Sequence, residues 1–110
     1  MKIAVCEDEI EVQKMFAESI QKVCPNAEIL CYLSGEALLE ADEQIDILFL
    51  DIQMPGKNGM ETARALRKRG MDTILIFVTA IEEYVFQAFD VGAFHYLVKP
   101  FEQEKFAEVL

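Results

Sequence analysis

Apolar residues in this chain gather in five short runs, and between the runs they recur every three or four positions. The runs cover Lys2–Cys6, Ala27–Leu33, Ile45–Leu50, Thr73–Val78 and Phe94–Val98. Several runs are nearly continuous rather than alternating, which is typical of strands that are covered on both faces. The pattern therefore predicts five strands, most of them buried inside one sheet.

The stretches between the runs have helical spacing. A stripe of apolar residues extends over Ile10–Val23 and predicts the first helix. Ser34 is expected to cap a short second helix. Asn58 and Gly59 open a third, which ends before Gly70. Each of the first three predicted strands is thus followed by a helix that leads into the next strand.

Two more helices are predicted over 82–90 and from Phe101 onward. Five repeats of strand and helix predict an α/β fold, a parallel sheet with helices on both faces. We expect the doubly wound flavodoxin-like (βα)5 architecture, whose known five-stranded order is 2-1-3-4-5. The length of 110 residues fits a single domain over 1–110. Because the last helix reaches Leu110 without a capping signal, we expect this domain to belong to a longer protein.

The charge balance excludes several classes of partner for this domain. Ten Lys and Arg face 20 Asp and Glu, a formal net charge of −10 at pH 7, and 53% of the residues are apolar. That composition is too apolar for a disordered chain and too acidic for wrapping nucleic acid or binding an anionic membrane. No apolar run approaches the roughly 20 residues of a membrane span. The N-terminus turns acidic at Glu7 without a signal peptide, so we expect a cytoplasmic location.

Other features suggest chemistry but have simpler explanations. Cys6, Cys24 and Cys31 are odd in number and form no C-x-x-C pair, so we expect buried, reduced thiols. The lone His95 has no second histidine with which to bind a metal. The basic run Arg64–Arg69 is expected to be a solvated helix end, where positive charge suits the helix dipole.

Polar side chains follow four of the five predicted strands. In an open α/β sheet, ligands bind beyond the carboxyl ends of the strands. The second strand, followed only by a Ser-Gly pair, is expected at the edge of the sheet. The other ends carry Glu7 and Asp8 after the first strand, Asp51 after the third, Thr79 after the fourth and Lys99 after the fifth.

Three carboxylates in one small site need a counter-charge. Two like charges ~4 Å apart repel by about 4 kcal/mol at an effective dielectric constant of about 20. Lys99 supplies one positive charge and cannot balance Glu7, Asp8 and Asp51 together. Carboxylate oxygens, carbonyl oxygens and water are the ligands that Mg²⁺ prefers. The sequence therefore predicts a divalent hard cation at this end of the sheet.

These residues stand in segments that resemble a known family. Glu7-Asp8, the segment Leu50–Gly59, the triplet Val78–Ala80 and the segment Tyr96–Phe101 are similar to the receiver domain of bacterial two-component response regulators. The resemblance covers essentially the whole chain in the right order. The sequence of the second half is most similar to receivers attached to LytTR-type DNA-binding domains.

The resemblance implies a phosphoacceptor and a metal site. Asp51 would accept a phosphoryl group from a sensor histidine kinase. Mg²⁺ would be held by Glu7, Asp8, Asp51 and the main-chain carbonyl of Gln53. The usual first acid of the family is Asp, and the longer side chain of Glu7 is expected to reach the ion with altered affinity.

The resemblance also implies how phosphorylation is sensed. Lys99 would pair with the phosphoryl oxygens, Thr79 would hydrogen-bond to them, and Tyr96 would turn inward as the switch residue. The phosphorylated domain would form a homodimer through helix 4, strand 5 and helix 5, and would bind DNA only through a separate output domain. The domain would be a switch rather than an enzyme, and the apolar Ile81 favours slow self-dephosphorylation.

Three other functions fit the residues less well. A magnesium-dependent phosphatase with an Asp nucleophile needs a second Asp two positions on as general acid, and Gln53 stands there. A receiver-like interaction module without phosphorylation would not need Asp8, Asp51, Thr79 and Lys99 together. A flavodoxin-like cofactor binder would need a phosphate-cradling loop, which is not evident.

Overall fold

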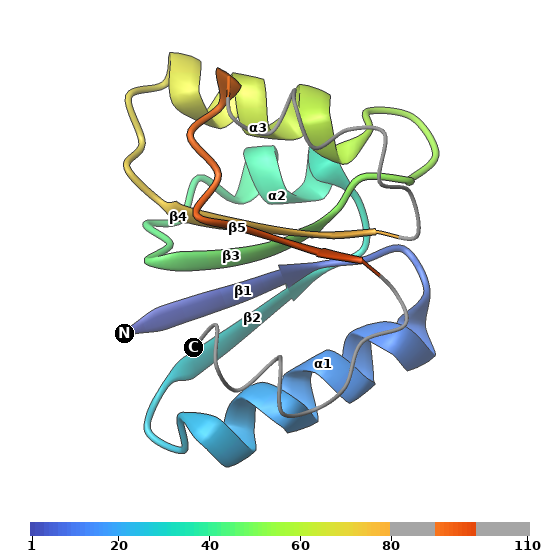
Figure 1. The fold of residues 1–110 in the computed structure, drawn as a ribbon, viewed down its shortest axis with the longest axis vertical. Helices are drawn as coiled ribbons and strands as arrows, with labels where there is room; N and C mark the ends of the chain where they lie inside the picture. Colours follow the sequence, from blue (N-terminus) through green and yellow to red (C-terminus); the bar gives the residue numbers. More distant parts are fainter. Residues whose placement is uncertain (80–89, 99–110) are drawn as a thin grey trace.

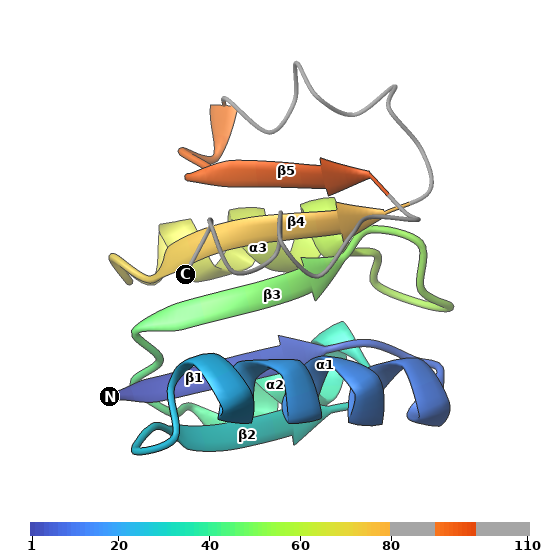
Figure 2. The same cartoon turned by 60° about the horizontal axis from the view of Figure 1, so that its bottom comes forward.

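The protein is a five-stranded parallel sheet with helices on both faces. The computed structural model describes residues 1–79 and 90–98. The strand order is β2-β1-β3-β4-β5, as predicted, and all four strand pairs are parallel. Figure 2 shows the five strands side by side with their carboxyl ends pointing the same way. The strands are β1 (Lys2–Cys6), β2 (Glu28–Tyr32), β3 (Ile47–Asp51), β4 (Ile74–Thr79) and β5 (His95–Val98).

The described helices begin and end close to the predicted positions. They are α1 (Ile10–Val23), α2 (Gly35–Ala41) and α3 (Gly59–Lys68). The hydroxyl of Ser34 accepts the N–H of Ala37 (3.0 Å), which caps α2 as predicted. Asn58 and Glu61 form a reciprocal capping box at the start of α3. The predicted helices over 82–90 and from Phe101 onward lie outside the described residues.

The two faces of the sheet bury separate apolar layers. Figure 1 shows α2 and α3 on one face of the sheet and α1 on the other. Alternate residues of one strand enter opposite layers: Ala4 and Cys6 of β1 pack under α2 and α3, whereas Ile3 and Val5 pack against α1. Both layers use β1, β3 and β4, which is why these strands are nearly continuous runs of apolar residues.

The edge position of β2 changes the environment of one cysteine. All three cysteines are free, and Cys6 is buried as predicted. Cys24 is half-buried, and the prediction of a buried thiol is wrong for Cys31, which is exposed. Cys31 lies on β2, which is at the edge of the described sheet and whose five residues are all exposed or half-buried.

Candidate metal and phosphoacceptor site

Three carboxylates meet at the carboxyl end of the sheet. Glu7 and Asp8 follow β1, and Asp51 is the last residue of β3. One carboxylate oxygen of each lies within 4.8 Å of the other two. Glu7 is 2% exposed and Asp51 is 7% exposed, so water screens these two charges poorly. The predicted convergence of these three residues is therefore present in the structure.

Strand pairing places these acids. β1 and β3 are neighbours, with Cys6 in register with Leu50, so the residues that follow both strands emerge side by side. The N–H of Glu7 donates to the carbonyl of Tyr32 (3.0 Å), which holds the first acid against the end of β2. Asp51 itself is still in register with Val78 of β4. Main-chain pairing on several strands thus fixes the cluster.

Main-chain N–H groups donate to two of the carboxylates. The N–H of Gln53 donates to Oδ1 of Asp51 (3.2 Å), and the N–H of Glu9 donates to Oε2 of Glu7 (3.3 Å). Both contacts stabilise the ionised form of the acid. Gln53 was predicted to contribute its carbonyl to a metal. The structure adds that its N–H contacts the proposed phosphoacceptor, while its side chain is exposed.

Crowding of negative charge changes the acidity of neighbouring groups. Burial raises the pKa of Asp8, and a hydrogen bond with Glu7 and the charges of Glu7 and Glu9 raise it further. Burial, followed by the charges of Asp51 and Glu7, raises the pKa of the Cys6 thiol to about 12. Both shifts have the direction expected where anions gather without a counter-charge. A divalent cation at this position would stabilise the ionised forms and so lower these pKa values.

The hard oxygen donors fit a magnesium ion. Three carboxylates at the ends of two neighbouring strands offer the ligand type that Mg²⁺ accepts, and Mg²⁺ commonly keeps several waters as its remaining ligands. The sulfur atoms of Cys6 and Met54 lie 3.8 Å from each other, and both residues are buried. Soft sulfur ligands suit other metals. Met54 packs in the core under α2 and α3.

Two further predicted site residues, Thr79 and Tyr96, lie on the next two strands. Thr79 ends β4, is fully buried, and stands in register with Val98. Tyr96 lies on β5 and is half-buried, with its ring centroid 6.2 Å from that of Phe77. Lys99, the predicted partner of the phosphoryl group, lies outside the described residues.

One acid near the site was missed by the sequence analysis. The sequence analysis noted only a Ser-Gly pair after the second strand. The next residue is Glu36, whose carboxylate accepts the N–H of Lys57 (3.1 Å) in the loop after β3. A Cβ on Gly56 would come within 2.7 Å of the Glu36 carboxylate, so the loop fits closely around this side chain. The signal was a carboxylate two residues after Ser34, the predicted cap of α2.

Gly59 is a second residue whose role was underestimated. It was predicted only to let the chain turn into the third helix. Its N–H donates to the carbonyl of Ile52 (2.9 Å), and a Cβ on Gly59 would lie 2.2 Å from the main-chain oxygen of Asp51. Helix α3 therefore begins in direct contact with the backbone of the proposed phosphoacceptor.

The doubly wound parallel sheet, with an acidic cluster where β1 and β3 end, places the chain among receiver-like α/β domains. The chain belongs to the response regulator receiver domain family, whose sequence model matches residues 3–110. It is thus the receiver domain of a two-component response regulator, which confirms the predicted family.

Individual relatives agree with this assignment. The sensory transduction protein LytT of Oceanobacillus iheyensis is 38% identical over 113 residues, which cover 94% of this chain and 44% of that protein. The response regulatory domain of protein mrkE from Klebsiella pneumoniae superposes with a TM-score of 0.91 at 27% identity, covering 99% of this chain and 91% of that one. The likeness to LytT agrees with the predicted LytTR-type subfamily.

A third relative was solved with magnesium and beryllium fluoride. The response regulator protein TrrA from Thermotoga maritima, in complex with Mg²⁺ and a beryllium fluoride, has a TM-score of 0.82 and 31% identity. The match covers 99% of this chain and 98% of that one. By contrast, the chain spans less than half the length of the curated relative LytT.

Proposed function

We propose that this chain is a phosphorylatable switch in which Asp51 accepts a phosphoryl group from a sensor histidine kinase. Glu7, Asp8, Asp51 and the main-chain carbonyl of Gln53 would hold Mg²⁺. The observation that carries the proposal is the convergence of three acidic ligand atoms within 4.8 Å, two of them on buried residues. A cluster of anions with so little solvent is explained by a bound cation.

The chemistry needs little more than correct positioning. A carboxylate oxygen of Asp51 attacks phosphorus, the bond from phosphorus to the histidine nitrogen of the kinase breaks, and an acyl phosphate forms on Asp51. Bound Mg²⁺ would supply charge neutralisation for the two anionic reactants. The N–H of Gln53, which donates to Oδ1 of Asp51, fixes the orientation of the carboxylate (3.2 Å).

Residues on β4 and β5, and Lys99 directly after β5, would respond to the charge that phosphorylation adds to Asp51. Phosphorylation replaces one negative charge with about two and adds strong acceptor oxygens. Lys99 would pair with these oxygens and Thr79 would donate its hydroxyl to them. Tyr96 would then change its packing against Phe77, its neighbour across β4 and β5. These roles come from the family resemblance and the strand positions.

The alternative of a phosphatase is disfavoured by Gln53. A general acid two residues after the nucleophile must exchange a proton, which an amide does not do. The domain is therefore proposed to transfer a phosphoryl group to itself once and to lose it slowly. The apolar Ile81 is proposed to slow that loss, and Ile81→Glu should hydrolyse the acyl phosphate faster; an unchanged or slower rate would contradict this role.

The surrounding protein belongs to the proposal as well. Because the chain spans 44% of the first LytT relative, residues 1–110 are proposed to be one domain of a longer regulator with a DNA-binding output domain. Phosphorylation-dependent dimerisation through the helix predicted over 82–90, β5 and the helix predicted from Phe101 onward is part of the same proposal, as is a cytoplasmic location. Among the described residues, no helix has the length and hydropathy of a membrane span.

Acetyl phosphate tests the central claim without a kinase. After incubation with Mg²⁺ and acetyl phosphate, the intact mass should increase by one phosphoryl group. Asp51→Asn should abolish the gain, because an amide does not form the acyl phosphate. Asp46→Asn is the matched control, since Asp46 is an exposed acid just before the start of β3. A phosphoryl gain in Asp51→Asn equal to that of the parent would overturn the proposal.

A further inference from the structure

One basic side chain of α3 binds the main chain of two other segments. Nε of Arg67 donates to the carbonyl of Val91 (2.7 Å), and one Nη donates to the carbonyl of Gly92 (3.3 Å). The other Nη donates to the carbonyl of Met71 (2.8 Å). The basic run Arg64–Arg69 was predicted to be a solvated helix end. Arg64, Lys68 and Arg69 are indeed exposed, whereas Arg67 is half-buried and its guanidinium fork donates to three carbonyls.

The segment bound by Arg67 leads directly into β5. Val91 is 5% exposed and belongs to the core under α2 and α3. Gly92 has φ +66°, a conformation that favours glycine. Two residues further on, the N–H of Phe94 donates to a carbonyl of β4 (2.8 Å). Arg67 thus fixes the turn from which the strand of Tyr96 begins.

The opposite end of α3 rests on the proposed phosphoacceptor. Gly59, the first residue of the helix, fits so closely that a Cβ would lie 2.2 Å from the oxygen of Asp51 and 2.8 Å from Cα of Ile52. Between the two ends, the buried face of α3 packs in the core through Met60, Ala63 and Leu66. Figure 1 shows α3 lying along the sheet between the loop after β3 and the segment before β5.

We propose that Arg67 is a positioning residue of the switch, which transmits a shift of α3 at the Asp51 backbone to the turn before β5 and so to Tyr96. The inference rests on the proposed function of Asp51. A packed helix of ten residues moves as one body, so a displacement at its first turn reaches its last. The guanidinium carries that displacement across to residues far away in the sequence.

The test separates phosphoryl uptake from the response of β5. Arg67→Met keeps the aliphatic stem and removes all donors, and Arg67→Lys keeps the charge without the planar fork. Each variant is treated with Mg²⁺ and acetyl phosphate, uptake is measured by intact mass, and the amide NMR shifts of Tyr96 and Leu97 report on β5. Arg67→Met should take up the phosphoryl group as the parent does, while the shift changes fall to about half or less.

Lys68→Met provides the matched control. Lys68 is the exposed next residue on α3, so its replacement removes one positive charge from the same helix end. The control should keep the full shift changes of Tyr96 and Leu97. Arg67→Lys should lie between Arg67→Met and the parent, because an ammonium group does not present the fork that contacts three carbonyls at once.

Each outcome decides a different claim. Full shift changes in Arg67→Met, with normal uptake, would overturn the role of Arg67 and leave the proposed function intact. If the parent chain takes up no phosphoryl group, the proposed function fails and the inference fails with it. If Arg67→Met does not fold, as judged by its amide spectrum, Arg67→Lys decides: a response equal to that of the parent counts against the inference.

Discussion

The two ends of the sheet use acidic side chains in opposite ways. At the carboxyl end, three acidic ligand atoms lie within 4.8 Å of one another, and among the described residues no other such cluster occurs. The amino end has a cavity of about 580 Å³ between the starts of β3 and β4. There, the carboxylate of Asp46 accepts the N–H of Lys2 (2.8 Å), so the acid extends the pairing of β1. An acid that extends the sheet stabilises the fold, whereas crowded acids need a ligand.

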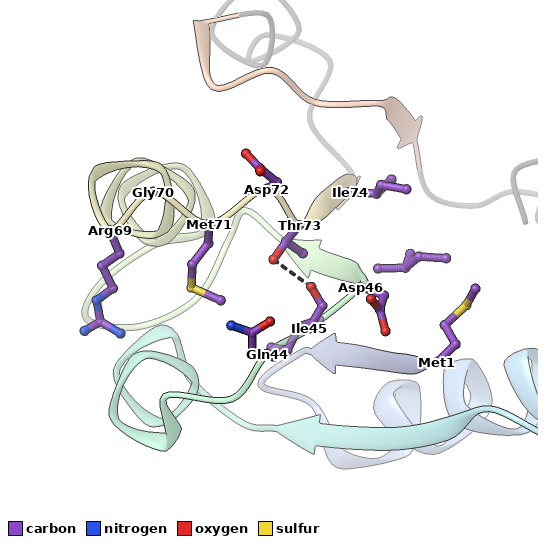
Figure 3. Close-up of a pocket in the computed structure, with 11 residues that line it drawn as sticks. Met1, Gln44, Ile45, Asp46, Arg69, Gly70, Met71, Asp72, Thr73 and Ile74 are labelled. Carbon is purple, nitrogen blue, oxygen red and sulfur yellow. Dashed lines mark hydrogen bonds between the residues drawn. The ribbon is translucent and has the colours of Figure 1, made fainter.

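Figure 3 shows how the amino end is arranged. The hydroxyl of Thr73 donates to the carbonyl of Ile45 (2.8 Å), the bond drawn as a dashed line. Arg69, another residue that lines this cavity, donates to the carbonyl of Leu39 (2.8 Å). These polar groups are occupied by main-chain atoms of the fold itself. The comparison shows that this cavity and the convergent acidic charge lie at opposite ends of the sheet.

Substitution of a glycine at each end gives the largest expected contrast. Gly59→Ala should lower the free energy of unfolding by about 3 kcal/mol, because the new Cβ meets main-chain atoms of Asp51 and Ile52 that cannot move aside cheaply. Gly70, beside the cavity at the amino end, has φ +76°, and a Cβ added there would meet nothing within 4 Å. Gly70→Ala should therefore cost about 1 kcal/mol, from backbone strain alone.

Urea denaturation of both glycine variants measures this contrast. The midpoints should shift while the slopes stay equal, because the same surface is exposed on unfolding. Equal losses for Gly59→Ala and Gly70→Ala would contradict the close contact between α3 and the backbone of Asp51.

Removal of one acid from each end gives the next largest effect. Asp8→Asn should weaken Mg²⁺ binding by about tenfold or more, because a carboxylate ligand is lost from the cluster. In magnesium-free buffer the same substitution should stabilise the fold, since it removes one of three like charges. Asp46→Asn should leave magnesium affinity unchanged. Calorimetric titration of both variants decides, and an equal loss in both would remove the distinction between the two ends.

Most of the fold could be predicted from the sequence because its signals are local. Continuous apolar runs identified the buried strands, and the caps Ser34 and Asn58 placed the starts of α2 and α3. The burial of Cys31 was predicted wrongly because apolar content does not show that β2, at the edge of the sheet, has no fully buried residue. The strand order itself came from a known architecture rather than from any single residue.

The charged residues of the site could be predicted from the sequence, but the contacts that hold the surrounding segments in place could not. Glu7, Asp8 and Asp51 were found because strand ends of a parallel sheet meet at one edge. The contacts of Glu36 with the loop after β3 and of Arg67 with the turn before β5 join residues 21 to 25 positions apart. Such contacts depend on how loops pack on one another, and no spacing rule encodes that packing.

The response of the two ends to pH gives the smallest expected effect. Burial, the hydrogen bond with Glu7 and nearby charge raise the pKa of Asp8 in the folded chain above its unfolded value of 3.8. The folded chain therefore binds a proton that the unfolded chain releases, and without Mg²⁺ the contribution of Asp8 to stability should increase as pH falls through the raised pKa. Protons compete with the metal, so magnesium affinity should fall over the same pH window.

Urea midpoints and magnesium titrations at several pH values measure both trends. Asp8→Asn should flatten both trends, while Asp46→Asn should leave them unchanged. A magnesium affinity that stays constant as the pH falls through this window would show that the crowded carboxylates at the carboxyl end do not bind the ion.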